Sequence, residues 1–549
     1  MEMAGGGRGI GISTTLHHLF FAQLYSTRQY RISSTLLVMT FSLLIIFHKY
    51  KNKRKNTLSL PPGPKPWPLV GSLPEMLINK PTFRWIHRLM EEMNSEIICI
   101  SLGNVSVIPV TSPEIACEFL KKFDSVFSSR PICLSAKVIS QGYLSAVLAP
   151  MGHQWKKMRR VLASEVLSPA RFRWLHKIRV EEADHLVRFV YNQSYKSSIS
   201  SGLVDIRATA KHYCANAIRR MIFGKRFFRE GREDGGPSVE DEEHVDALFT
   251  ILEYLYSFCI SDYIPWLRGN LDLDDQEKII KKAVITCRKY QDPIIEERVG
   301  EWKRGARAEK KDWLDVLITL VNEDGIPLLS IDEIKAQITE LMLATVDNPS
   351  NAIEWALAEM LNQPEILKKA LEELDTVVGK ERLVQESDLP QLNYVKACIK
   401  EAFRLHPVAP FNVPHVSVAD TTVAGYFIPK GSHVLLSRPG LGRNPRVWEE
   451  PLKFQPERHL KADGSEVGLN DSDLRMLSFS IGRRGCAGVT LGSAITTMLM
   501  ARLLQGFTWK LPPKVSKIEL KESANTLFLA KPLLVLAEPR LAENLYFSL

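Results

Sequence analysis

The chain has 549 residues, of which 45% are hydrophobic and 24% are charged, and this composition excludes an intrinsically disordered or low-complexity protein. Residues 1–60 carry eight Lys and Arg residues against the single acid Glu2, so only +2 of the net charge of +9 belongs to the remainder, which argues against a nucleic-acid-binding protein. The eight cysteines form no CxxC or CxxH pair, which argues against a zinc site or a dense disulfide framework.

The first predicted element is a membrane anchor over residues 32–48. The uncharged run from Ile32 to Phe47 is followed at once by the basic stretch HKYKNKRKN, which is typical of a stop-transfer signal. This pattern predicts a lumenal segment over residues 1–31, a single pass through the endoplasmic-reticulum membrane and a cytosolic catalytic domain. A cleaved signal peptide and an organelle transit peptide are the alternatives, because Met1–Arg31 is poor in acids.

Residues 49–74 combine the basic stretch with the proline-rich segment LPPGPKPWPLVGSLP. Prolines fix the backbone in an extended form and prevent a helix, so we interpret residues 49–74 as a basic stop-transfer segment and hinge. An ordinary surface loop is the alternative. Residues 75–549 show no internal repeat and no further long linker, and we expect one large, mainly helical catalytic domain there.

Trp155 and Arg159 lie four residues apart in a predicted helix, so an indole N–H and a guanidinium are expected to point the same way. An ordinary amphipathic helix is the commoner interpretation of such a pair when it stands alone.

A second helix is predicted from a capping box at Ser330–Glu333 to about Asn362, on the order of 48 Å long, and it should cross the centre of the domain. Pro349 has no N–H, so the carbonyl of Thr345 should lose its partner, which predicts a kink and a free acceptor. Asn348 can donate and accept a hydrogen bond but cannot act as an acid, which leaves proton transfer to water, the substrate's own groups, Asp347 or Ser350. A helix irregularity without function is the alternative.

Glu401 and Arg404 form an ExxR pair on one face of a further helix. Such a pair is usually a solvated ion pair, but this one precedes a distinctive cysteine loop by about 85 residues.

That loop, Phe479–Gly488, reads FSIGRRGCAG and is followed by a helix-forming segment. A cysteine thiolate bound to haem iron requires a tight backbone turn, N–H groups near the sulfur and a cation for a haem propionate. The three glycines, the following helix and Arg484 meet these requirements, and Phe479 is expected to pack beneath the ring. A buried structural cysteine is the alternative.

The pattern FxxGRRxCxG resembles the haem-binding loop of cytochromes P450, and WKKMR, KEAFR and FQPER resemble three further signatures of that family. The resemblance covers nearly the whole chain from Leu60 onward and implies the cytochrome P450 fold, mainly α with a small β part. It implies haem b, with the thiolate of Cys486 as the iron ligand. The residues it implies for the haem propionates are Trp155, Arg159, Arg484 and His415. The buried charge triad that it implies consists of Glu401, Arg404 and Arg458.

The segment ELMLATVDNPSNAIEWALAEM, with KEAFRLHPVAPFNVPHVS and FQPERHL, is similar to the plant amino-acid N-monooxygenases. Most monooxygenases of this fold have a threonine after the acid, where this chain has Asn348-Pro349, and most have an aromatic residue at the position of His459. The resemblance implies two N-hydroxylations of an L-α-amino acid, then dehydration and decarboxylation to an (E)-aldoxime, a precursor of cyanogenic glucosides, glucosinolates or volatile nitriles. NADPH-cytochrome P450 reductase is the implied source of electrons and dioxygen that of oxygen.

Among amino acids, the resemblance favours phenylalanine and then tyrosine. We expect the Thr345 carbonyl or Asp347 to orient the substrate amine. Pocket candidates are residues 135–149, the middle of the central helix with Asn348, and Val408–Val413 with Phe411. The sequence does not identify a partner for the substrate carboxylate.

Three other functions stay open at this point. A haem-thiolate isomerase or dehydratase is favoured by the missing threonine, and a carbon-hydroxylating cytochrome P450 of specialised metabolism requires the Asn-Pro-Ser segment to be incidental. A haem sensor without catalysis would not need the basic cluster Lys156, Lys157, Arg159 and Arg160 on the helix expected to face the reductase, although that cluster is also compatible with a solvated face.

Overall fold

A computed structural model describes residues 39, 40, 42, 58–195, 202–264 and 272–547. The chain divides into two units, residues 1–59 and 60–549. Residues 1–31 and nearly all of the predicted anchor over 32–48 lie outside the described residues. No helix within the described part of the chain has both the length and the apolar character needed to cross a bilayer.

The proline-rich segment belongs to the second unit, which begins at Leu60. The Cys99 N–H donates to the Pro62 carbonyl at 2.8 Å, and the Ser72 N–H donates to the Ser101 carbonyl at 2.6 Å. Residues 60–74 therefore form part of the folded unit, upstream of the boundary predicted at residue 75.

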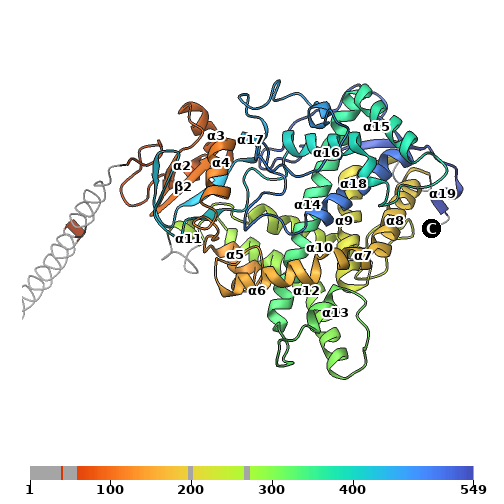
Figure 1. The fold of residues 1–549 in the computed structure, drawn as a ribbon, viewed down its shortest axis with the longest axis horizontal. Helices are drawn as coiled ribbons and strands as arrows, with labels where there is room; N and C mark the ends of the chain where they lie inside the picture. The colour runs from red at the N-terminus through yellow and green to blue at the C-terminus, as the bar shows by residue number, and fades with distance from the viewer. Residues whose placement is uncertain (1–38, 41, 43–57, 196–201, 265–271, 548–549) are drawn as a thin grey trace, which may run out of the picture. The chain divides into compact units, whose positions relative to one another are not determined.

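The unit 60–549 is mainly helical, as predicted (Figure 1). Its longer helices are α3 (Thr82–Glu92), α6 (His153–Val161), α8 (His176–Tyr195), α9 (Ile206–Phe223), α10 (Val239–Tyr254), α12 (Gln276–Lys303), α14 (Ile331–Asn362), α15 (Pro364–Val377), α16 (Asn393–Leu405) and α18 (Val489–Gly506). Shorter helices are α2 (Leu73–Ile78), α4 (Pro113–Cys117), α5 (Leu134–Ile139), α7 (Pro169–Trp174), α11 (Ile260–Tyr263), α13 (Trp313–Ile318), α17 (Arg438–Gly442) and α19 (Asn544–Phe547).

The β part consists of three small sheets in the described residues. The largest has the strand order β1 (Ile100–Leu102), β2 (Val105–Val110), β7 (His433–Leu436) and β4 (His415–Val416), with β2 and β7 parallel and the outer pairs antiparallel. The others are antiparallel: β3 (Leu203–Asp205), β9 (Leu534–Pro539) and β8 (Phe507–Lys510), and the pair β5 (Thr421–Val423) and β6 (Tyr426–Ile428).

Apolar side chains cover both faces of the four-stranded sheet because successive residues of a strand point to opposite sides. Val107 packs with Leu435 in one cluster, and Ile108 packs with Val434 and Leu436 in the other. A much larger apolar core lies among the helices.

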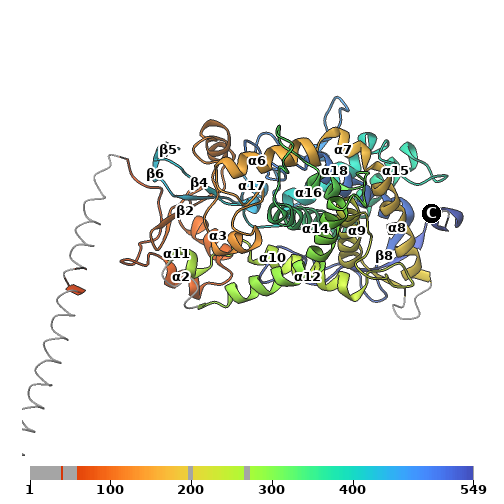
Figure 2. The same ribbon diagram turned by 90° about the horizontal axis from the view of Figure 1, so that it is seen from below.

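The helix α14 occupies the middle of the helical core, where α9, α10, α12, α15, α16 and α18 pack against it (Figures 1 and 2). The predicted capping box is confirmed, since the Ser330 hydroxyl accepts from the Glu333 N–H and the Glu333 carboxylate accepts from the Ser330 N–H. The helix ends at Asn362, as predicted, and continues through Pro349. The predicted kink stays a prediction.

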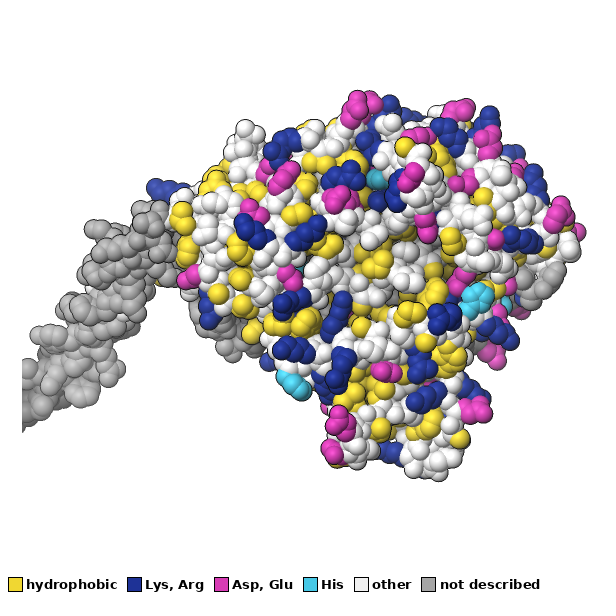
Figure 3. Space-filling model, in the orientation of Figure 1, with side chains coloured by type: hydrophobic (Ala, Val, Ile, Leu, Met, Phe, Trp, Pro, Cys, Tyr) yellow, Lys and Arg dark blue, Asp and Glu magenta, His cyan; other side chains and the backbone are white. Residues whose placement is uncertain are grey.

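The surface carries charges of both signs. On the face seen in Figure 3, Lys and Arg side chains are interspersed with Asp and Glu. This distribution agrees with the near balance of charge after residue 60.

Candidate active site

A cavity lies between the middle of α14, the loop 479–488 and the segments 146–147 and 407–415. Cys486 lines it and is exposed there, whereas six of the other cysteines are buried and Cys117 is half-buried. The apolar lining includes Leu341, Ala344 and Leu491. One reactive sulfur thus faces a largely apolar space.

The loop before α18 turns tightly around this sulfur. Gly482 adopts a φ of +75°, and a Cβ there would lie 2.6 Å from the Leu120 carbonyl oxygen, so only glycine fits. The Cys486 N–H donates to the Phe479 carbonyl at 2.9 Å, and the Gly488 N–H donates to the Cys486 Sγ at 3.2 Å.

Burial raises the pKa of the Cys486 thiol, while the Gly488 N–H and the charges of Arg159 and Arg438 act in the opposite direction. The protein groups alone therefore do not make the sulfur a thiolate. A cation bound to the sulfur would favour the thiolate, as expected of a metal ligand.

Three arginines gather at one side of the cavity. Arg130 donates to the Val413 and Pro414 carbonyls at 2.7 and 2.8 Å, and Arg159 donates to the Gly485 carbonyl at 2.8 Å. Arg484 donates to the Ser128 and Ala149 carbonyls at 2.6 and 2.8 Å and lies 4.4 Å from the centre of the Trp155 ring.

No carboxylate among the described residues forms an ion pair with any of the three. Burial, together with the neighbouring charge of Arg130, lowers the pKa of Arg484 to about 9. Burial also lowers the pKa of Arg130 to about 10. Cations at a cavity wall that are held by backbone carbonyls and form no ion pair with a carboxylate call for an anion from outside the chain.

His415 belongs to the same side of the cavity, where its Nδ1 lies 2.7 Å from the Phe127 carbonyl oxygen. A carbonyl only accepts, so Nδ1 carries the proton. Burial and the charges of Arg130 and Arg484 hold the pKa of His415 well below its usual range, which makes the ring neutral. In the neutral ring, Nε2 has no proton and can only accept a hydrogen bond. His415 can therefore donate to a propionate only if a nearby anion first raises the pKa of the ring enough to protonate Nε2.

These residues fit haem b. The macrocycle needs an apolar slot, its iron needs a soft ligand and its two propionates need cations. The cavity offers Cys486 within an apolar lining and, at one side, Trp155, Arg159, Arg484 and Arg130. Phe479 also lines the cavity and packs edge-on against Phe403, 6.0 Å between ring centres.

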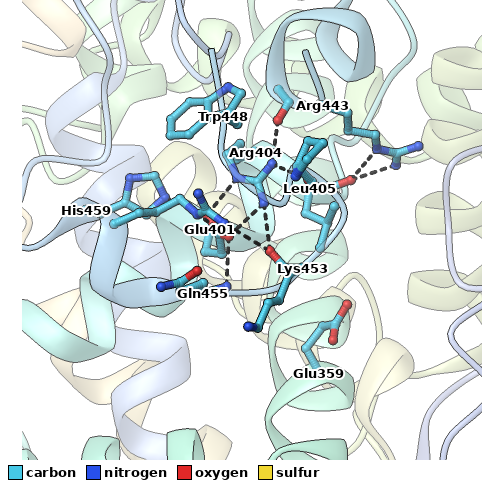
Figure 4. A network of polar contacts seen from close by, with 12 residues as sticks. Glu359, Glu401, Arg404, Leu405, Arg443, Trp448, Lys453, Gln455 and His459 are labelled. Atoms are coloured by element: carbon cyan, nitrogen blue, oxygen red, sulfur yellow. Dashed lines mark hydrogen bonds and ion pairs between the residues drawn. The ribbon is translucent and has the colours of Figure 1, made fainter. Parts of the chain in front are cut away.

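Beside the cavity, Glu401 is the centre of a buried polar network (Figure 4). Its carboxylate accepts two hydrogen bonds from Arg404, at 2.7 and 2.8 Å, and one from Arg458 at 3.0 Å. The Arg404 side chain also donates to the carbonyls of Gly442, Pro451 and Lys453. The structure thus brings the predicted triad together.

The network has a fourth member that sequence reasoning noticed only as an unusual residue. His459 Nε2 lies 2.7 Å from Glu401 Oε2, and Trp448 packs against both Arg404 and His459. Against the effect of burial, Arg404 and His459 hold the pKa of the Glu401 carboxyl at about 2.

Five residues of α14 were predicted to act on the substrate, and the structure places some of them in the cavity lining and others outside it. Thr345, Asn348 and Pro349 line the cavity. Ser350 is buried, and its hydroxyl donates to the Val346 carbonyl at 2.8 Å. Asp347 is buried outside the lining, and burial raises its carboxyl pKa to about 7 against the charges of Lys211 and Arg438.

Phe411 does not line the cavity, which corrects its prediction as a pocket residue. Phe411 pairs with Ser437 in an extended stretch, where the side chains of neighbouring residues point to opposite sides. Since Asn412 lines the cavity, the Phe411 side chain points away from it. There it stacks on His87, 5.1 Å between ring centres. Val408, Asn412 and Val413 line the cavity from this segment, and Ala146 and Val147 line it from 135–149.

The basic cluster on α6 is smaller than the sequence suggests. Lys157 pairs with Glu333 at 2.7 Å, and Arg159 faces the cavity. Only Lys156 and Arg160 are exposed.

Sequence reasoning missed three charged residues of the cavity, Arg130, Arg438 and Glu340. Both arginines occur in a Ser-Arg-Pro triplet, and Arg438 directly follows a run of apolar strand residues, where a lone cation is a usable signal. Glu340 accepts from the Val147 N–H at 2.5 and 2.9 Å, and burial raises its pKa to about 7.

Comparison with known proteins agrees with this geometry. A family model described as Cytochrome P450 matches residues 61–537. The chain is 59% identical to a tyrosine N-monooxygenase from Sorghum bicolor, with 89% of this chain and 88% of the relative covered. It is 58% identical to a phenylalanine N-monooxygenase from Prunus mume (93% and 97%) and 56% identical to a valine N-monooxygenase from Manihot esculenta (93% and 94%).

Replacing Cys486 tests the predicted iron ligand. We expect Cys486→Ala to lose the carbon monoxide difference spectrum typical of thiolate-ligated haem, because no other cysteine lines the cavity. Cys117→Ala is the matched control, since this half-buried thiol lies elsewhere, and it should keep the spectrum. A thiolate-type spectrum in Cys486→Ala would contradict the assignment.

Replacing Glu401 tests the network. Glu401→Gln leaves the buried Arg404 without its counter-charge, so we expect a loss of about 3–5 kcal/mol in the free energy of unfolding, measured by thermal and denaturant melts. Glu372→Gln, which changes a carboxylate on the exposed face of α15, should cost under about 1 kcal/mol.

The same residue predicts a pH dependence. Its folded pKa of about 2 lies below the usual 4.5, so the stabilisation is complete above about pH 4.5 and is lost as the pH falls toward 2. Glu401→Gln should lack this component of acid unfolding. An equal acid dependence in wild type and variant would show that other carboxylates control it.

Proposed function

This chain belongs to the cytochrome P450 family, and from that premise we propose that it is an amino-acid N-monooxygenase that converts an L-amino acid to its (E)-aldoxime. The overall conversion comprises two N-hydroxylations, a dehydration and a decarboxylation. The observation that carries the proposal is that Thr345, Asn348 and Pro349 of α14 line the same cavity as Cys486.

Haem bound to Cys486 supplies activation of dioxygen with electrons from NADPH through a reductase. The chain's own residues must present a neutral amine, because an ammonium has no lone pair to receive oxygen. Pro349 cannot donate to the Thr345 carbonyl, so that oxygen is available to accept a hydrogen bond from the amine. The Asn348 side chain offers a donor and an acceptor beside it.

Asp347 is suited to exchange protons with this site. With a pKa of about 7, its carboxyl is partly protonated at neutral pH, whereas an exposed aspartate is not. Its Oδ1 is buried without a hydrogen-bond partner among the described residues. This carboxyl changes protonation near neutral pH and precedes Asn348 in the chain. Because Asp347 does not itself line the cavity, it can take up the proton that the ammonium must lose through an intervening water.

For the substrate we propose L-phenylalanine, with L-tyrosine second. The support is the likeness of the central helix and of the segment after Cys486 to members that use aromatic amino acids. Relatives of nearly equal identity are named for tyrosine, phenylalanine and valine, so overall identity does not separate these side chains.

We propose further that the enzyme works at the endoplasmic-reticulum membrane, with the catalytic unit in the cytosol beside NADPH-cytochrome P450 reductase. The support is the uncharged run from Ile32 and the basic stretch after it.

The deciding experiment expresses the full chain in microsomes with a plant reductase and supplies each of the twenty amino acids separately. We expect an NADPH- and dioxygen-dependent aldoxime from phenylalanine, identified by mass spectrometry. Oxidation at carbon with the amine intact would favour an ordinary hydroxylase. A product formed without NADPH would favour an isomerase or dehydratase.

The central helix gives a separate prediction. Asn348→Thr combined with Pro349→Thr restores an N–H for the Thr345 carbonyl and removes the amide, so we expect N-hydroxylation to fall at least about tenfold. The variant should consume NADPH without matching product, which is measured by the ratio of aldoxime formed to NADPH oxidised. Ser465→Ala, in an exposed loop, is the control. An unchanged ratio in the double variant would show that the altered helix has no role.

A further inference from the structure

A fourth arginine, Arg438, also lines the cavity. It directly follows Ser437, the residue after β7, and is the first residue of α17, where its N–H donates to the Pro410 carbonyl at 3.0 Å. This bond and the pairing of Phe411 with Ser437 fix it against the segment 408–413, which also contributes lining residues. Its backbone is therefore held rigidly.

The guanidinium of Arg438 has no partner among the described residues. No hydrogen bond or ion pair joins its side chain to any of them, and its Nε is buried and unpaired. Arg130, Arg159 and Arg484, by contrast, each donate to backbone carbonyls. Burial lowers the pKa of Arg438 to about 10, with only Asp347 and Cys486 acting against it. A guanidinium that lines the cavity with its Nε buried and unpaired calls for an anionic ligand that enters the cavity.

Two kinds of carboxylate can enter, the haem propionates and the carboxylate of the substrate. The propionate side already has Arg130, Arg484 and His415, whose charges influence one another's pKa values. Arg438 is bonded through its backbone to Pro410, in the stretch whose His406 carbonyl accepts from Asn351 of α14 at 3.5 Å, and its charge acts on Asp347 of that helix. Its charge is thus placed toward α14, where the substrate amine is proposed to lie.

Resting on the proposed function, we infer that Arg438 binds the α-carboxylate of the amino-acid substrate. A guanidinium fork binds a carboxylate through two parallel hydrogen bonds, which fix its orientation as well as its position. The amine and the carboxylate share one carbon atom in an α-amino acid. Holding the carboxylate at Arg438 therefore directs the nitrogen toward the wall formed by Thr345 and Asn348, and the side chain toward the remaining apolar lining.

The test compares two ligands of wild type and of Arg438→Gln in microsomes: L-phenylalanine, or whichever amino acid the wild type accepts, and the corresponding amine without the carboxylate. Both are titrated by the change in the haem absorption spectrum. We expect Arg438→Gln to weaken amino-acid binding by about 10- to 100-fold and to change amine binding less than about threefold. Arg438→Lys should recover part of the loss, since it keeps the charge without the fork. Arg446→Gln, an exposed arginine in the same segment, is the matched control and should bind both ligands as wild type does.

The outcomes separate this inference from the function on which it rests. Wild type that forms no aldoxime from any amino acid would refute the proposed function, and the inference with it. Wild type that forms aldoxime, with Arg438→Gln binding the amino acid unchanged or losing both ligands equally, would overturn the inference alone. Loss of haem from both Arg438→Gln and Arg438→Lys would also overturn it, because Arg438 would then serve the cofactor.

Discussion

The buried ion pair between Glu401 and Arg404 holds together the part of the structure from which the cavity is built. Arg404 lies on α16 but donates to carbonyls of residues 442, 451 and 453, so one guanidinium joins a core helix to a long irregular stretch. Burying the Arg404 guanidinium without hydrogen-bond acceptors would cost free energy. Moving α16 away from the stretch 442–453 would remove these acceptors, so the guanidinium keeps the two together. Because α16 also packs on α14 and α18, the same pair helps to set the distance between the two walls of the cavity.

The electrostatics of the cavity follow from an unequal distribution of charge. Arginines line it without forming ion pairs to carboxylates, while Glu340 and Asp347, the acids near it, are shifted toward their neutral forms. The wall is therefore more positive than its composition suggests. Such a cavity favours ligands that bring their own negative charge, which is a property shared by a dicarboxylate cofactor and an amino acid.

Much of this was predictable, because the features concerned are local. The capping box at Ser330, the glycine-rich loop around Cys486 and the spacing of Glu401 and Arg404 all act within a few residues. The residues that were missed depend on contacts between distant segments. His459 reaches Glu401 across 58 positions, and Arg438 enters the cavity because Ser437 pairs with Phe411. Phe411 was assigned to the wrong face because the sequence does not show which side of an extended stretch faces the cavity.

The proline in α14 has a consequence for how this site can change. The acceptor that it is predicted to free is the main-chain oxygen of Thr345, and every amino acid has that oxygen. No replacement at position 345 can withdraw it, and an exchange at position 349 for any residue with an N–H can. Whether this oxygen is free to accept a hydrogen bond therefore depends on residue 349, which lies one helical turn after Thr345. A single substitution that gained or lost this proline would make the Thr345 carbonyl available or unavailable as an acceptor, and would leave the shape of the surrounding wall largely unchanged.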